Sequence, residues 1–392
     1  MKILLTIARI IVGVLYIFSG LVKANDPLGL SYKMQEFFEV WGWMVFNDYS
    51  LTFSILMIAF EIIAGVAVLL GWRMKLFSWL LLLLIIFFTF LTGYAVLSGK
   101  IRSCGCFGDC IPLTAEQSFM KDIILLLLIL FIFAYRNRVQ PLFKPVASIV
   151  WLAIATVFSF GLQWYVLKHL PIVDCLPYKV GKNMVQQMKV PPGAIADSTV
   201  ITFVYNKQGK PVEFTSDNFP DDFDDSLYHF VKRYDKLVRK GNAEPPIKDF
   251  SLTTMSDNDT TQALLNADGY SALLFVKNDI EHADEWLTTV AGLRTNLLAQ
   301  KNIPFYVVSS NVVLADQYFN HNPEPVNATI LKCDFVAIKT AARANPTLYL
   351  LNKGVIVNKW SYADFDKAIK AIIVLPVQQA AAVAIADSPK NK

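Results

Sequence analysis

Charged residues are scarce in this sequence of 392 residues. Asp, Glu, Lys and Arg make up 17% of the chain and hydrophobic residues 54%, whereas soluble domains carry about 25% charged residues. This low charge content excludes a wholly water-soluble protein and predicts that much of the chain lies in lipid. The net charge of +4 is small. Its distribution over the loops indicates membrane orientation rather than a nucleic-acid-binding face.

Motifs for several common chemistries are also missing. The chain has no Gly-rich phosphate loop, no Ser-His-Asp order and no His-Glu-x-x-His motif, so nucleotide use and hydrolysis have no support. A zinc site is not predicted, because its fourth ligand would have to come from Asp109 or a distant residue. No metal is assigned, and a metal-handling role is the weakest of the functions considered.

Long apolar runs are present, but only in the first half of the chain. Spanning a bilayer requires about 20 apolar residues. Five expected spans meet this length, near residues 3–22, 51–71, 76–98, 119–135 and 146–167. From residue 170 onward the chain reads as water-soluble, so a membrane half is followed by a soluble half.

Acidic residues are absent from three of the regions that flank the spans. The charged residues of these regions are all basic: Lys2, Arg73, Lys75, Arg136, Arg138 and Lys144. The other two loops contain Asp26, Glu36, Glu39, Asp48, Asp109 and Glu116. Because Lys and Arg concentrate on the cytoplasmic side, the N-terminus is predicted to be cytoplasmic. Five spans then place the C-terminal half in the periplasm of a bacterial inner membrane.

All five cysteines fall outside the expected spans and on the predicted periplasmic side, where disulfides persist: Cys104, Cys106, Cys110, Cys175 and Cys333. Their number is odd, so at least one is free, paired between chains or exchanging. The first three lie in one short loop, residues 103–110, whose two glycines allow a tight fold.

This cysteine loop (residues 103–110) is predicted to exchange disulfides. A Cys-x-Cys bridge is geometrically strained and is therefore easily exchanged, and a third cysteine could resolve a mixed disulfide. Thr114 is expected to cap the next helix, whose N-terminus would lower the pKa of a nearby thiol. We therefore assign exchange to Cys104, Cys106 and Cys110. A static structural bridge is the main alternative.

Two charged residues, Arg9 and Glu61, stand out within the expected spans. Ionisable groups there cost at least ~2.5 kcal/mol each and usually find partners in the bundle interior. They indicate a polar pocket, a quinone site or a proton path. The alternatives are that Arg9 extends to the cytoplasmic surface and that Glu61 is a hydrogen-bonded anchor between helices.

Several motifs, taken in this order, resemble the DoxX/MauE family: residues 9–13, 18–23, 26–29, 61–65, 69–71 and, for the MauE branch, 104–108. The resemblance covers about residues 3–136 and implies a four-helix membrane domain, residues 1–136, with a redox-associated role. MauE proteins are linked to maturation of disulfide-rich methylamine dehydrogenase, and DoxX relatives to quinone-coupled sulfur oxidation. A quinone near Glu61 and Arg9 is implied by this resemblance. The fifth span, within residues 137–170, departs from the family pattern.

The soluble half contains a repeating β/α pattern after residue 245. Residues 271–276 read as a strand buried on both faces, followed by a helix (282–300), a strand (303–309), a hairpin (345–351 and 354–360) and a closing helix (365–373). This order resembles a thioredoxin-like α/β fold over about residues 246–375, with Pro346 at the position of the family's cis-proline. An α+β linker region is expected over 171–245 and a flexible tail over 376–392.

The Cys-x-x-Cys pair of active thioredoxin-like proteins is missing. Its place is taken by residues 277–282, which contain no cysteine, so no dithiol exchange is expected there. Cys333 is expected to be a buried or lone thiol, and a structural role is assigned to Cys175. The soluble domain is predicted to bind a protein or peptide rather than to turn over disulfides by itself.

One functional hypothesis and one rival follow. In the first, a lipid-embedded protein assists periplasmic thiol–disulfide chemistry or the maturation of a client protein, as a thiol–disulfide or quinone-linked oxidoreductase component. Quinone is the only candidate cofactor, and no nucleic acid is involved. In the rival, the chain is a non-catalytic scaffold whose disulfides are structural and whose soluble domain docks a partner.

Overall fold

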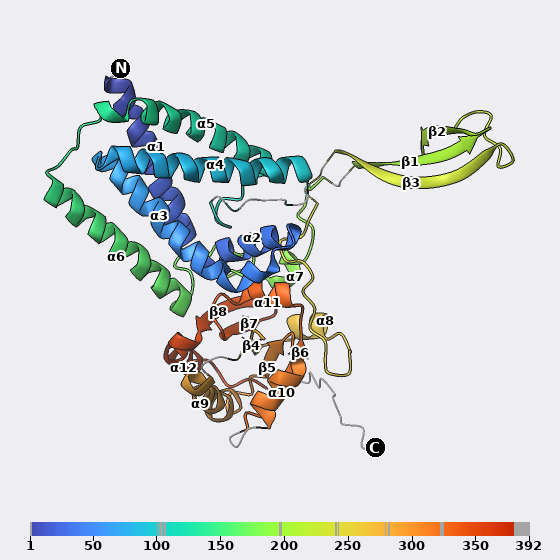
Figure 1. Cartoon of the computed structure of the whole chain (residues 1–392). Coiled ribbons are helices and arrows are strands. Elements are labelled where there is room, and N and C mark those ends of the chain that lie inside the picture. The colour runs from blue at the N-terminus through green and yellow to red at the C-terminus, as the bar shows by residue number, and fades with distance from the viewer. Residues whose placement is uncertain are drawn as a thin grey trace.

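Five long apolar helices form the membrane half, as the sequence predicts. The computed structural model of the chain describes residues 2–99, 101, 105, 107–195, 198–239, 241, 243–278, 280, 283–321 and 325–379. The spanning helices are α1 (Lys2–Ala24), α3 (Ser50–Leu70), α4 (Met74–Ser98), α5 (Ala115–Ala134) and α6 (Pro145–His169). Figure 1 shows α6 at the edge of the bundle, and the N-terminus at the end of the bundle far from the soluble half.

A sixth helix lies in the loop between the first two spans. α2 (Pro27–Val40) begins at Asp26, whose side chain accepts a hydrogen bond from the Gly29 N–H at 3.2 Å. Proline at the first helical position costs no hydrogen bond, because that N–H has no partner within a helix. A 3-10 segment, Met44–Tyr49, then leads into α3. α2 lies between the spans and the soluble half (Figure 1), so it forms part of the surface that this half contacts.

The first and third helices pack closely because small residues face each other. A Cβ atom added to Gly65 would lie 2.9 Å from the Gly13 carbonyl oxygen, so the two backbones are nearly in contact. α5 starts with a capping box, in which Thr114 and Gln117 each accept a hydrogen bond from the other's backbone N–H. The predicted helix start at Thr114 is confirmed.

A three-stranded antiparallel sheet projects from the molecule as an arm (Figure 1). Its strands are β1 (Ser198–Lys207), β2 (Lys210–Thr215) and β3 (Tyr228–Arg239), in the order β2-β1-β3. On one face, the ring of Tyr205 contacts those of Phe214, Phe223 and Phe230 at centroid distances of 5.1, 5.3 and 5.5 Å. These aromatic contacts stabilise a sheet that none of the described helices covers.

The soluble half also contains an α/β domain with a five-stranded mixed sheet. Its strands are β4 (Tyr270–Phe275), β5 (Phe305–Ser309), β6 (Thr329–Lys332), β7 (Thr347–Asn352) and β8 (Val355–Ser361), in the order β6-β5-β4-β7-β8. β4, β5 and β6 are parallel, whereas β7 and β8 form an antiparallel hairpin. The expected strands and hairpin are confirmed within a few residues, and the Asn345–Pro346 peptide before β7 is cis.

Helices cover both faces of this sheet, as the buried run in β4 predicts. Leu274 faces a core that includes α9 (Ala283–Leu293), α10 (Val312–Asn320) and α12 (Phe365–Ile373). Leu273, its neighbour, faces a second core that includes α7 (Met184–Gln187), α8 (Thr261–Leu265) and α11 (Phe335–Ala341). The closing helix α12 has the predicted bounds.

Two expected boundaries are corrected by packing. Tyr178 and Met184, which were expected in a separate linker region, are buried in the second core of the α/β domain. The segment that leaves α6 is therefore part of this domain. Gln378, expected in a flexible tail, donates a hydrogen bond from Nε2 to the Tyr270 carbonyl oxygen at 3.0 Å. Residues 376–379 thus continue the domain, and residues 380–392 lie outside the described residues.

Candidate functional site

A disulfide joins Cys110 to Cys175, with their Cα atoms 4.8 Å apart. It connects the loop between α4 and α5 to the segment that leaves α6. Cys110 was expected to exchange with Cys104 and Cys106; in the structure its bonding partner is Cys175. The end of α6 returns the chain to the same end of the bundle as the cysteine loop, so Cys175 lies within bonding distance of Cys110. The structural role of Cys175 stays a prediction.

Cys333 is a free thiol in the core of the α/β domain, with 3% of its surface exposed. Burial raises its pKa to about 12, so the thiolate needed for exchange is not populated at neutral pH. The expectation of a buried lone thiol is confirmed. With Cys110, Cys175 and Cys333 accounted for, the remaining cysteines are Cys104 and Cys106, which lie outside the described residues.

A buried arginine holds the α/β domain against the bundle. Arg343 lies just after α11, and 5% of its side chain is exposed. Its Nε lies 2.8 Å from Asp26 Oδ2, at the start of α2, and its Nη2 lies 3.0 Å from Asp109 Oδ2, in the cysteine loop. Burial lowers the pKa of Arg343, but the two carboxylates outweigh this and the pKa is raised. The guanidinium therefore stays charged and bridges both carboxylates.

Further polar contacts join the same two surfaces. Lys359 Nζ lies 2.8 Å from Asp174 Oδ2, and burial lowers the pKa of this lysine. Lys277, at the end of β4, donates from Nζ to the Tyr32 hydroxyl of α2 at 3.3 Å. Asp109 and Asp174 directly precede the two bridged cysteines in sequence. The disulfide and the ion pairs therefore fix one contact region, which we call the docking contact (Asp26, Asp109, Cys110, Asp174, Cys175, Arg343 and Lys359).

A second group of buried charges lies inside the bundle. Lys23 Nζ, from α1, lies 2.5 Å from Glu61 Oε1, from α3, with side-chain exposures of 3% and 1%. Ser19 Oγ donates to the other oxygen of Glu61 at 3.2 Å. Glu61 is thus paired and hydrogen-bonded, as a buried ionised group requires.

A second carboxylate, Asp122 of α5, lies in the same polar region. It accepts a hydrogen bond from Thr92 Oγ1 at 3.0 Å and pairs with Lys121 at 2.6 Å. Both Glu61 and Asp122 line a small space of about 30 Å³. The buried Tyr16 hydroxyl has no hydrogen-bond partner among the described residues. Asp122 was not predicted as a site residue, although its charge inside the fourth expected span could have identified it.

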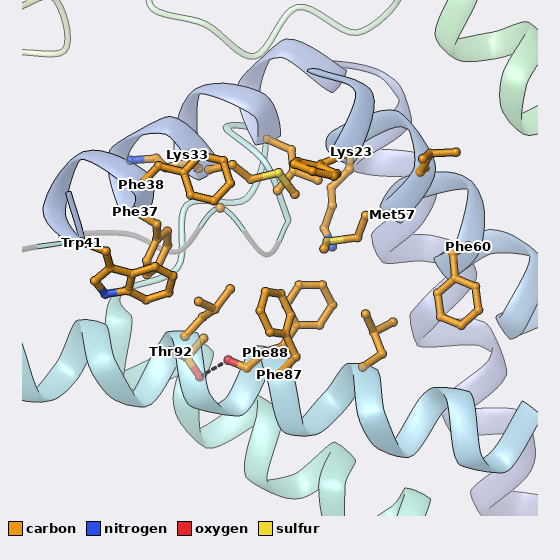
Figure 2. A pocket seen from close by; sticks show the side chains of 17 residues that line it. Lys23, Lys33, Phe37, Phe38, Trp41, Met57, Phe60, Phe87, Phe88 and Thr92 are labelled. Carbon is orange, nitrogen blue, oxygen red and sulfur yellow. Dashed lines mark hydrogen bonds between the residues drawn. The ribbon is translucent and has the colours of Figure 1, made fainter. Parts of the chain in front are cut away.

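An apolar cavity of about 450 Å³ adjoins this polar region. α4 forms one wall and α2 the opposite wall: in Figure 2, Phe87 and Phe88 of α4 face the side of α2 that carries Phe37, Phe38 and Trp41. Lys23 extends into the space from α1 (Figure 2), with its Nζ 5.0 Å from the centre of the Phe88 ring. Gly105 of the cysteine loop also lines the cavity.

Arg9 does not contribute to this region, which corrects the expectation of a site shared with Glu61. Arg9 Nη1 donates to the Gln140 carbonyl oxygen at 3.4 Å, in the loop before α6. Lys23 follows Arg9 by 14 positions in α1, which corresponds to roughly 20 Å along a helix. Arg9 is therefore near the opposite end of the bundle.

The site joins an apolar cavity to a buried lysine–carboxylate pair. Gly105 is the described residue of the cysteine loop that lines this cavity. Among the described residues, no group of three or more His, Cys, Asp or Glu side chains could hold a metal ion.

Comparison with known proteins adds independent information. Residues 1–135 match the family model described as methylamine utilisation protein MauE. The chain carries a MauE-like membrane domain. Residues 199–240, which form the arm, match a model described as a domain of unknown function, DUF8463. Protein TlpB of Flavobacterium psychrophilum is 26% identical over 157 residues, which is 39% of this chain and 42% of that protein. No solved structure matches.

Proposed function

We propose that this protein carries out thiol–disulfide exchange at the outer face of a bacterial inner membrane and so assists the maturation of a client protein. In this proposal the N-terminus is cytoplasmic, and the docking contact, the arm and the α/β domain are periplasmic. The MauE-like domain and the match to TlpB support a redox or maturation role.

The single observation that carries the proposal is the distribution of the cysteines. Cys110 and Cys175 are bridged and Cys333 is buried. Cys104 and Cys106 therefore remain as the exchanging pair, and Gly105 between them lines the apolar cavity. In exchange, a client thiolate attacks a Cys104–Cys106 disulfide, and the client's second thiol resolves the mixed disulfide. The client gains a disulfide and the pair becomes a dithiol.

The dithiol must then lose two electrons and two protons before it can react again. A membrane quinone is the acceptor that we propose, since it takes up two electrons and two protons on reduction to the quinol. The earlier placement of the quinone between Glu61 and Arg9 is not retained, because Arg9 lies near one end of α1, whereas Glu61, from α3, pairs with Lys23 near the other end.

The α/β domain is proposed to be a thioredoxin-like domain that no longer exchanges disulfides. The order of β4, α9 and β5, the cis peptide before β7 and the closing helix α12 support this interpretation. Lys277 follows β4, where active members carry a cysteine pair, and it contacts α2 of the membrane domain. The domain is therefore proposed to position the cysteine loop through the docking contact.

A non-catalytic scaffold is the second candidate, and one observation favours it. The described disulfide links two segments that are also joined to the α/β domain by ion pairs, which is the arrangement expected of a structural bridge. In this candidate, Cys104 and Cys106 are inert and the arm or the α/β domain binds a partner.

Alkylation of intact cells, followed by mass spectrometry of each cysteine, tests the proposal. We expect Cys104 and Cys106 to be found as a mixture of reduced, oxidised and partner-linked forms. Cys110 and Cys175 should be uniformly bridged, and buried Cys333 should be unmodified, which makes these three the internal controls.

A uniform state of Cys104 and Cys106, together with unchanged client disulfides in a Cys104→Ser/Cys106→Ser variant, would contradict exchange and favour the scaffold. A client trapped on Cys104 or Cys106 would identify the substrate directly. The same capture from the Cys333→Ser variant should be as strong as from the unaltered protein.

A further inference from the structure

The two edges of the arm differ in whether they can accept another strand. β3 lies at one edge of the sheet, spans 12 residues and contains neither proline nor glycine. β2, at the other edge, spans 6 residues and includes Pro211. Short length and proline both hinder an edge strand from pairing with another chain. β3 is therefore the edge at which the sheet can be extended.

The outer side of β3 is open among the described residues. Within this part of the chain, β1 is the strand that pairs with β3, so the backbone groups on the other side of β3 have no strand partner there. Figure 1 shows the arm extending away from both the helical bundle and the α/β domain. A peptide that adds to such an edge gains a row of main-chain hydrogen bonds, and the side chains beside the edge select its sequence.

The side chains of β3 differ between the two faces of the arm. Phe230 lies opposite Tyr205 of β1, and their ring centroids are 5.5 Å apart, so Phe230 belongs to the aromatic face. Its side chain is nevertheless 58% exposed. Lys232 lies opposite Val204, the neighbour of Tyr205, and is therefore exposed on the other face. A strand added to β3 thus meets an apolar ring on one face and a cation on the other.

The charge of β3 determines which kind of strand fits beside it. Its sequence contains four Lys or Arg residues and one acidic residue, Asp235, which pairs with Arg233 at 3.2 Å. Like charges directly across two strands are destabilising, whereas opposite charges stabilise the pair. A second copy of β3 would bring two basic strands together and is repelled. A strand that carries carboxylates is attracted by the same basic side chains.

We propose that β3 binds an extended segment of a partner protein, in which acidic and apolar residues alternate, as a fourth strand of the arm. Because successive side chains of a strand point to opposite faces, the apolar residues of this segment pack beside Phe230. Its carboxylates lie on the other face, beside Lys232. This binding site goes beyond the proposed thiol exchange and does not depend on it.

Fluorescence anisotropy with a labelled synthetic peptide of alternating Glu and Val, and with the full-length protein in phosphatidylcholine nanodiscs, tests the proposal. This Glu/Val peptide should bind about tenfold more tightly than a peptide of alternating Lys and Val, which extends equally well but has the opposite charge. A Glu/Val peptide whose backbone nitrogens are all methylated keeps its carboxylates but donates no main-chain hydrogen bond. Its binding should be lost.

Variants of the arm supply the second comparison. Lys232→Glu should weaken binding of the Glu/Val peptide by about fivefold, because an attraction becomes a repulsion. The matched control is Lys210→Glu, the same change of charge at an exposed lysine of β2. It should leave binding unchanged. In the unaltered protein, the bound peptide should slow hydrogen exchange of the backbone in β3 and leave exchange in β2 as it is.

Three results would overturn the proposal. They are equal binding of the Glu/Val and Lys/Val peptides, undiminished binding of the methylated peptide, and equal losses in the Lys232→Glu and Lys210→Glu variants. Failure of the Glu/Val peptide to bind would also refute it. If phosphatidylglycerol vesicles then bind the unaltered protein but not the Lys232→Glu variant, the arm recognises an anionic membrane surface instead of a peptide.

Discussion

The protein contains two groups of paired charges, each centred on a buried cation, that differ in what surrounds them. Lys23 and Glu61 pair inside the bundle, next to an open apolar cavity. Arg343 pairs with Asp26 and Asp109 between the bundle and the α/β domain, next to a disulfide. The first group has space beside it in which a ligand can bind. The second is enclosed by two parts of the chain that it fastens together.

Burial of an ion pair therefore does not by itself indicate function. A buried ion pair is costly to form, because both charges lose their hydration. Removing only one partner is also costly, because the other is left charged and unpaired. Stability measurements alone would rank both groups as important. Ligand binding should respond only to the group in the bundle, and domain docking only to the group outside it.

The largest effect is expected from Arg343→Met. This change leaves two carboxylates facing each other without their shared partner and should lower the free energy of unfolding by about 3–5 kcal/mol. Thermal unfolding and limited proteolysis of the detergent-solubilised protein would measure the loss and the release of the α/β domain. The matched control is Arg233→Met, on the arm, where arginine and Asp235 are 51% and 52% exposed. It should cost under about 1 kcal/mol, and equal losses in the two variants would contradict the role of Arg343.

A somewhat smaller loss of about 3 kcal/mol is expected for Lys23→Met, which leaves one buried carboxylate unpaired. Adding Glu61→Gln should restore part of the stability, because a neutral amide no longer needs a cation. Thermal unfolding of the single and double variants gives the coupling free energy between Lys23 and Glu61. A double variant that loses the sum of both single effects would show that the two side chains act independently.

The disulfide should contribute less than either ion group, about 2 kcal/mol. The Cys110→Ser/Cys175→Ser variant, or reduction of the unaltered protein, is expected to lower the thermal midpoint to the same extent. Reduction should lower the thermal midpoint of a Cys333→Ala variant by as much as that of the unaltered protein, because Cys333 takes no part in the bridge. A thermal midpoint of the unaltered protein that does not change on reduction would contradict a stabilising bridge.

The smallest effect concerns Asp364, which contacts His169 at the end of α6 at 2.9 Å. Burial raises the pKa of Asp364, but hydrogen bonds from Lys367, His169 and Ser361 outweigh burial and the pKa is lowered. A carboxyl group whose pKa is lower in the folded than in the unfolded state stabilises the fold above the unfolded pKa of about 3.9. This contribution is lost as the pH falls through the folded-state pKa. Between pH 6 and pH 3, the unaltered protein should lose under about 1 kcal/mol more stability than the Asp364→Asn variant. Asp364→Asn should remove this component, and an unchanged pH dependence in the variant would refute it.

The sequence predicts the helices and strands well because their signals are local. Apolar length defines the spans, and the capping residue Thr114 and the continuous apolar run in β4 identify helix and strand. Cys333 could also be predicted as buried, since it lies in an apolar α/β pattern.

The contacts between distant segments could not be read from the sequence. The bond between Cys110 and Cys175 depends on where α6 ends in space, and the pairing of Lys23 with Glu61 depends on how α1 crosses α3. Arg343 looks like an ordinary surface arginine until α2 is known to lie against it. Asp122 was accessible in principle, because its position inside an apolar run is visible in the sequence.

The bridge between Cys110 and Cys175 closes a covalent ring of the chain that contains α5 and α6. The basic loop between these helices, residues 136–144, lies within this ring and at the end of the bundle away from the disulfide. A protease cut there would open the ring without separating its pieces. The two fragments should migrate as one species on a non-reducing gel and as two after reduction, so the topology of the ring can be tested with a single cut.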